Sequence, residues 1–123
     1  MEPSPYAFIS CFAPYAEARA VVFGAPFDST ASFRPGARFA PSAIRAESSG
    51  IETYSPYQML DLEDIRVFDA GDLELPFGSA SRAVGEIESF VGKLSGDGRM
   101  PCMIGGEHLV TLGAVRALAS GCE

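Results

Sequence analysis

The sequence lacks the features that assign a chain to a disulfide-rich, membrane-spanning or nucleic-acid-binding class. Its three cysteines, Cys11, Cys102 and Cys122, lie far apart without C-x-x-C spacing, which indicates neither a disulfide framework nor a zinc knuckle. No apolar run approaches the ~20 residues that span a bilayer. Nine basic residues against 16 acidic ones give a net charge of -7, which disfavours nucleic acid and anionic membranes as partners. A small cationic substrate is compatible with that charge.

The start of the chain carries no targeting pattern. Met1-Glu2-Pro3-Ser4-Pro5 has an acid and two prolines where a secretory signal would carry basic residues and then an apolar stretch. Because unpaired cysteines also suit a reducing compartment, we expect a cytoplasmic protein. Residues 1–17 have no clean period and predict an extended arm, and residues 18–123 predict an α/β core portion of one small domain.

Three short apolar segments predict β-strands. They are Ala20 to Phe23, Ile65 to Phe68 and Met100 to Ile104, and such continuous apolar runs are typical of strands buried on both faces. After the first strand, Asp28 to Gly36 predicts a loop, and after the second, Asp69 to Asp72 predicts a turn.

The segments between and after these strands predict helices. Pro41 suits the first turn of a short helix over Ser42 to Ser48, which Gly50 can end in left-handed geometry. Apolar residues at three- and four-residue spacing predict a long helix over Ser79 to Leu94 and a final one over Leu109 to Ala119. Helices of this length between strands indicate right-handed parallel crossovers, and therefore an α/β fold with a parallel sheet.

The only histidine, His108, follows the third predicted strand in the turn before the last helix. Ligands of open parallel sheets bind at the carboxyl ends of the strands, and Gly105 and Gly106 allow a tight turn and a close approach. Neutral imidazole is the commonest protein metal ligand. Glu107 either orients that ligand or is an acid at a helix start that the macrodipole favours. One ligand does not make a metal site, so the spacing alone favours a structural or surface role for His108.

Several motifs resemble, in order, those of the ureohydrolase (arginase/agmatinase) family, and bacterial agmatinases most closely. The matching segments are Phe23 to Asp28, Phe33 to Arg45, Glu52 to Tyr57, Asp69 to Leu73, Leu75 to Gly78 and Gly105 to Val110. The resemblance implies a three-layer α/β/α fold of the arginase/deacetylase type with a parallel sheet. It also implies that His108 is the first ligand of a paired manganese centre, with Gly105, Gly106 and Glu107 supporting it.

The activity implied by the resemblance is hydrolysis of agmatine to putrescine and urea by a manganese-bridged hydroxide. The family's other ligands lie in an Asp-Ala-His-x-Asp motif and an Asp-x-Asp-x-x-Asp motif, and this sequence contains neither. We therefore expect the amino-terminal part of a ureohydrolase domain, cut after the third strand–helix unit. It would carry no catalytic residue, be inactive alone, and belong to a homo-oligomer when intact. Its substrate-binding residues are unknown.

Two alternatives stay open. The intact enzyme could act on guanidinobutyrate or formimidoylglutamate, or the chain could be a non-catalytic truncated module that associates through an open sheet edge.

Four further charged residues have open roles. Asp69 and Asp72 could bind a metal or act as acid and base, although carboxylates in turns more often accept backbone N–H bonds. Arg34 and Arg38 are poor partners for the cationic guanidinium of agmatine, so we expect them to brace a loop or to contact a subunit.

Overall fold

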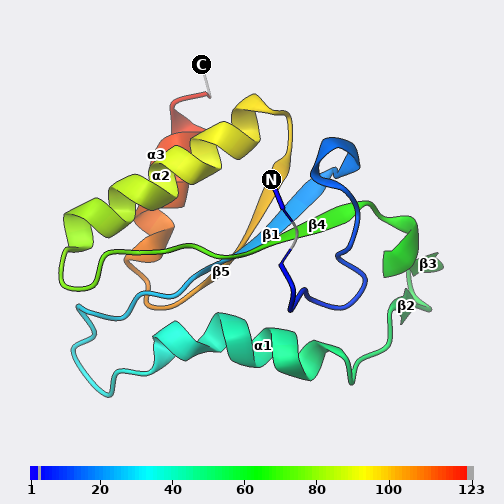
Figure 1. The fold of residues 1–123 in the computed structure, drawn as a ribbon, viewed down its shortest axis with the longest axis horizontal. Coiled ribbons are helices and arrows are strands. Elements are labelled where there is room, and N and C mark those ends of the chain that lie inside the picture. Colours follow the sequence, from blue (N-terminus) through cyan, green and yellow to red (C-terminus); the bar gives the residue numbers. More distant parts are fainter. Residues whose placement is uncertain (3, 122–123) are drawn as a thin grey trace.

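The structure is a computed structural model that describes residues 1–2 and 4–121. Its main sheet contains β1 (Ala20–Ala25), β4 (Val67–Asp72) and β5 (Met100–Gly105), and its helices are α1 (Ala40–Ser48), α2 (Ala80–Gly96) and α3 (Val110–Ala119). A small antiparallel pair, β2 (Tyr54–Ser55) and β3 (Leu60–Asp61), and three 3₁₀ turns, Tyr15–Glu17, Ala37–Phe39 and Leu62–Asp64, complete the fold. In Figure 1, α2 and α3 cover one face of the sheet and α1 covers the other, so the predicted three layers are present.

The three predicted strands lie in one parallel sheet in the order β4-β1-β5. In the central strand, Ala20 pairs with Val67 on one side and with Met100 on the other. The predicted parallel arrangement is therefore confirmed. All three strands end at the same edge of the sheet, which brings the loops that follow them together.

The prediction that the third strand is buried on both faces is wrong. The residues of β5 from Pro101 to Gly105 are half-buried, and Met100 is 62% exposed. The physical reason is position in the sheet, because β5 is an edge strand and no strand among the described residues pairs with its outer side. The central strand β1 meets the expectation, since five of its six residues are buried.

The apolar core lies between the sheet and the layer formed by α2 and α3. Val21, Phe23 and Phe68 of the sheet pack there against the predicted apolar stripe of α2, which consists of Ala83, Val84, Ile87, Val91 and Leu94. Burying one large aliphatic or aromatic side chain stabilises the fold by roughly 1.5–3 kcal/mol. No helix in the described part of the chain is long and apolar enough to cross a membrane.

Two details of the elements differ from the sequence prediction. The second strand begins at Val67 and continues through Asp72, so the predicted turn over Asp69 to Asp72 is strand instead. Helix α1 begins at Ala40, and Gly50 does not end it in left-handed geometry. The residue after the helix, Ser49, keeps right-handed dihedral angles, and the Gly50 amide donates to the Glu47 carbonyl at 3.0 Å.

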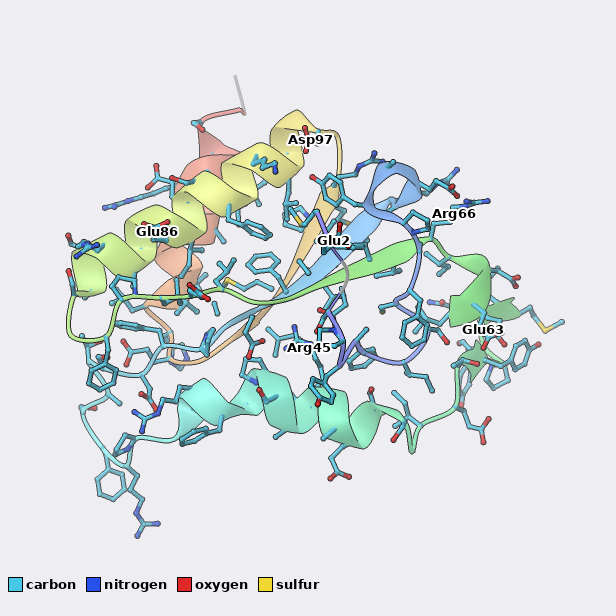
Figure 2. The ribbon with its side chains drawn as sticks, in the orientation of Figure 1. Glu2, Arg45, Glu63, Arg66, Glu86 and Asp97 are labelled. Atoms are coloured by element: carbon cyan, nitrogen blue, oxygen red, sulfur yellow. The ribbon has the colours of Figure 1, made fainter. Side chains whose placement is uncertain are left out.

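A buried ion pair fastens α1 to the sheet. Arg45 of α1 donates from Nε and Nη2 to the two carboxylate oxygens of Asp69, at 2.8 and 3.0 Å, and from Nη1 to Asp72. Asp69 is fully buried and Arg45 is only 8% exposed. Figure 2 shows Arg45 on the side of α1 that faces the sheet. Burial opposes the charge on Arg45, but hydrogen bonds and attraction from the two carboxylates outweigh it and raise the pKa of the guanidinium.

The same carboxylate also holds the amino-terminal arm. Asp69 accepts hydrogen bonds from the amides of Phe8, at 2.7 Å, and Gly71, at 2.8 Å. The arm then runs beside β4, where the Asp69 amide donates to the Cys11 carbonyl at 3.1 Å. One side chain therefore connects the arm, α1 and β4.

Gly24 provides the space that this arrangement needs. A Cβ atom at this position would lie 2.0 Å from Oδ1 of Asp72 and 2.8 Å from Cβ of Pro41. Any side chain here would displace the Asp72 carboxylate and lift the start of α1 from β1.

The two cysteines in the described part of the chain are free thiols. Burial, together with the nearby charge of Asp69, raises the pKa of Cys11 to about 11, so this thiol stays neutral. Burial also raises the pKa of Cys102. Cys122 lies outside the described residues.

The loop after β1 is organised around a second buried carboxylate. Asp28 is 3% exposed and accepts hydrogen bonds from the amides of Gly36, at 2.6 Å, and Arg38, at 3.3 Å. The Arg38 guanidinium donates to its other oxygen at 3.1 Å. Burial disfavours the ionised form, but these hydrogen bonds and the Arg38 charge outweigh it and lower the pKa of Asp28.

Removing the buried cation should destabilise the fold strongly. We expect Arg45→Met to lower the free energy of unfolding by about 3–5 kcal/mol, because it leaves Asp69 buried without its charge partner. The matched control is Arg66→Met, since Arg66 pairs with Glu17 while both side chains are more than half exposed. That change should cost less than about 1 kcal/mol. Urea titration of both variants measures the difference, and equal losses would contradict a dominant role for Arg45.

Stability at acid pH should depend on Asp28. Its folded-state pKa lies below the ordinary value of 3.8, so the unfolded chain binds the proton first as the pH falls. The contribution of Asp28 to the free energy of unfolding is therefore present above 3.8 and is lost as the pH falls through the lower folded-state value. Urea midpoints measured from pH 7 to pH 2 should converge between the wild type and Asp28→Asn at the acid end. A constant difference would refute this assignment.

Candidate functional site

The candidate site is the turn over residues 105–108 and the loop that faces it. The turn follows β5, and the loop over residues 26–36 follows β1, so both lie at the carboxyl end of the sheet. In Figure 1 the orange turn lies beside the blue-to-cyan loop. The structure thus brings residues about 80 positions apart together at the edge where parallel sheets bind ligands.

Backbone hydrogen bonds join the turn to the end of β1. The Gly106 amide donates to the Ala25 carbonyl at 3.0 Å, and the Glu107 amide donates to the Phe27 carbonyl at 2.8 Å. A Cβ atom at Gly106 would lie 2.1 Å from the oxygen of Phe27. Only glycine permits this approach, because the obstructing atom belongs to the backbone. At Gly105 a Cβ atom would lie 2.8 Å from Cγ2 of Val110, which couples the turn to the first residue of α3.

The side chain of Glu107 makes a further connection to the loop. Its Oε2 accepts from the amide of Thr30 at 3.2 Å, and its Oε1 accepts from the Thr30 hydroxyl. Sequence analysis did not identify Thr30, because no local pattern pairs two residues that lie 77 positions apart. Its polar side chain in a loop rich in serine and threonine was the only available signal.

The structure places His108 in the predicted turn directly after β5. Its carbonyl accepts from the Thr111 amide at 3.1 Å, in the first turn of α3, and the residue is exposed. The imidazole is therefore accessible at the carboxyl end of a parallel strand. Its role as a metal ligand stays a prediction.

The described residues do not form a metal centre by themselves. Among them, no group of three or more histidine, cysteine, aspartate or glutamate side chains lies close enough to hold an ion. Asp69 and Asp72 bind Arg45, and Asp28 binds Arg38. His108 offers one ligand, whereas a pair of manganese ions needs several oxygen and nitrogen donors.

The two loop arginines differ in their surroundings. Arg38 pairs with Asp28, and its guanidinium carbon lies 4.9 Å from the ring centre of Phe39, so it braces the loop as the sequence suggests. Arg34 lies on an exposed stretch with a positive φ of 48° and stacks over the neighbouring Phe33 ring at 5.1 Å.

A cavity of about 430 Å³ lies elsewhere, between the amino-terminal arm and α1. Its polar lining includes Ser4, Ser42, Ser49 and the exposed side of the Arg45–Asp72 pair. The residues of the His108 turn do not line it, so it belongs to the attachment of α1 and not to the candidate site.

Comparisons with known proteins agree with this geometry. A model of the arginase family matches residues 18–123. Agmatinases of Bacillus anthracis and Halalkalibacterium halodurans are 46% and 49% identical to the chain, over 91% and 90% of its length and 39% and 38% of theirs. The solved structure of the agmatine ureohydrolase of Thermoplasma volcanium superposes with a TM-score of 0.87 at 38% identity, covering 93% of this chain and 39% of that one.

These similarities confirm the predicted arginase-like fold and the predicted family. The chain spans about two fifths of the length of the curated relatives that it matches. The family model covers all three strands of the main sheet, their helices and the Gly105–His108 turn. The chain therefore belongs to the arginase family.

Proposed function

We propose that this chain is part of an agmatinase-type enzyme, which in its intact form hydrolyses agmatine to putrescine and urea. The observation that carries the proposal is the Gly-Gly-Glu-His turn at the carboxyl end of β5, in a chain 46% and 49% identical to two bacterial agmatinases. The net charge of -7 is compatible with a cationic guanidino substrate.

His108 is the proposed metal ligand of this segment. Its exposed imidazole lies at the ligand-binding edge of the sheet, and Gly105, Gly106 and Glu107 hold the turn that carries it. Manganese is the metal expected from the family resemblance. Because the described residues supply one ligand only, the remaining ligands must come from elsewhere in an intact enzyme, and no catalytic step is assigned to this segment.

A second candidate is a non-catalytic module that associates through its sheet edge. The exposure of β5 favours it, because an unpaired edge strand with an apolar exposed residue such as Met100 offers a template for another strand. Both candidates predict that the chain alone is inactive, so they are separated by a chimera that is active only if this segment can complete an enzyme.

Activity should require sequence that this chain does not contain. We expect the 123-residue chain to release no urea from agmatine with added manganese, because it supplies one metal ligand. A chimera that continues residues 1–121 with the carboxyl-terminal part of the Bacillus anthracis agmatinase should release urea. Urea release by the chain alone would disprove the dependence on further ligands, and a folded chimera that releases no urea would contradict the proposed function of this segment.

In the active chimera, His108→Ala should impair both metal binding and turnover. We expect kcat/KM to fall by at least ~10–100-fold, since even groups that only support metal ligands contribute that much. Manganese content, measured by elemental analysis, should fall as well. The control is Glu86→Gln, an exposed residue of α2 that is labelled in Figure 2. Full activity and full metal content in His108→Ala would exclude His108 as a ligand.

A further inference from the structure

The contact between Glu107 and Thr30 adds to backbone hydrogen bonds that already join the His108 turn to β1 and its loop. The backbone of residues 106 and 107 is already joined to β1 and its loop by two hydrogen bonds, to the carbonyls of Ala25 and Phe27. The carboxylate of Glu107 then continues along the same loop and binds both the amide and the hydroxyl of Thr30. Three consecutive attachment points thus lie immediately before His108.

The loop that Glu107 holds also has hydrogen bonds of its own. The Ala31 amide donates to the Asp28 carbonyl at 3.2 Å, which closes a tight turn around Thr30. Asp28 binds the amides of Gly36 and Arg38, which closes the base of the loop next to α1. Thr30 lies in the tight turn on the exposed part of the loop, and among the described contacts its amide and hydroxyl bond only to Glu107. Without that contact, the turn around Thr30 would lose its side-chain attachment to the His108 turn.

We propose that Glu107 is a positioning residue that fixes His108 by holding Thr30 of the β1 loop against the His108 turn. The inference rests on the proposed role of His108 as a ligand. Glu107 and His108 are adjacent, so any rotation of the turn that moves the carboxylate away from Thr30 also moves the imidazole. The loop and the turn act as one unit whose internal order sets the direction of the His108 side chain.

The competing explanation for Glu107 is its place before α3. An acid near a helix start interacts favourably with the macrodipole, and this effect needs no contact with Thr30. Substitutions at Thr30 separate the two explanations, because they leave the charge of Glu107 unchanged. Thr30→Val removes the hydroxyl donor and keeps the branched shape, while Thr30→Ser keeps the donor.

The test is nuclear magnetic resonance of the full, metal-free chain with ¹⁵N-labelled histidine. Because His108 is the only histidine, its ring nitrogens give one set of signals that reports its tautomer and surroundings. We expect Thr30→Val and Glu107→Ala to shift these signals. Thr30→Ser, which keeps the hydroxyl, should leave them at the wild-type positions. The Thr30 amide should exchange with solvent roughly tenfold faster in Glu107→Ala, the factor that corresponds to one lost hydrogen bond.

A double variant completes the experiment. Thr30→Val combined with Glu107→Ala should shift the His108 signals no further than Glu107→Ala alone, because either change breaks the same hydroxyl contact. Glu86→Gln on α2 is the control for loss of a negative charge and should leave the signals in place. If Thr30→Val keeps the wild-type His108 spectrum while Glu107→Ala shifts it, Glu107 acts through the helix and the proposal is overturned. If Thr30→Val unfolds the chain, Glu107→Gln replaces it, because the glutamine amide can still bond to Thr30 without the charge. A wild-type His108 spectrum in Glu107→Gln then supports the proposal, and a shifted one overturns it.

The outcome is independent of the proposed activity. The spectra need neither metal nor substrate, so failure of the urea assay would leave the positioning role intact, and an unchanged spectrum would leave the agmatinase proposal intact. In the active chimera, the same positioning should appear as about tenfold weaker manganese binding in Thr30→Val than in Thr30→Ser.

Discussion

The salt bridge between Arg45 and Asp69 is the interaction on which the position of α1 depends. The buried residues of α1 are Pro41, Arg45 and Ser48, so this helix brings no large apolar side chain to the sheet. The charges of Arg45 and Asp69 are both removed from water. This is favourable only when every polar atom of the pair has a hydrogen-bond partner. The amides of Phe8 and Gly71 meet that condition for Asp69. Charge pairing, and not a large apolar side chain of the helix, therefore decides where α1 lies, whereas the arm also buries Cys11 against Ala20 and Val67.

Different interactions consequently hold the helices on the two faces of the sheet. On the face covered by α2 and α3, apolar side chains pack closely, and Gly113 lets the helices approach until a Cβ atom would lie 2.6 Å from the Val84 carbonyl oxygen. Such packing tolerates small adjustments as long as volume is conserved. On the α1 face, the apolar cluster of Cys11, Ala20 and Val67 is smaller, and the directional hydrogen bonds of Arg45 and Asp69 allow one arrangement of the helix. That arrangement also fixes where the loop after β1 ends, because the loop leads directly into the start of α1 at Ala40.

Local patterns predicted much of the fold and part of the site. The apolar runs located the strands, and the stripe of α2 was correct, because both signals lie within one element. The strand–glycine–histidine–helix order likewise placed His108 correctly. The exposure of β5 could not be predicted, since burial of an edge depends on which strands flank it. Arg45, which pairs with Asp69, and Thr30, which binds Glu107, lie 24 and 77 positions away from them, so these contacts required the folded chain.

The dual use of Asp69 has a consequence for local opening of the molecule. Its carboxylate holds the arm through the Phe8 amide and α1 through Arg45, so release of either one leaves the other with a weakened anchor. Proteins open in cooperative units whose boundaries follow such shared contacts. We therefore expect the arm and α1 to open as one such unit while the layer of α2 and α3 stays folded. Slow hydrogen exchange would then be confined to β1 and the helices that cover its apolar face.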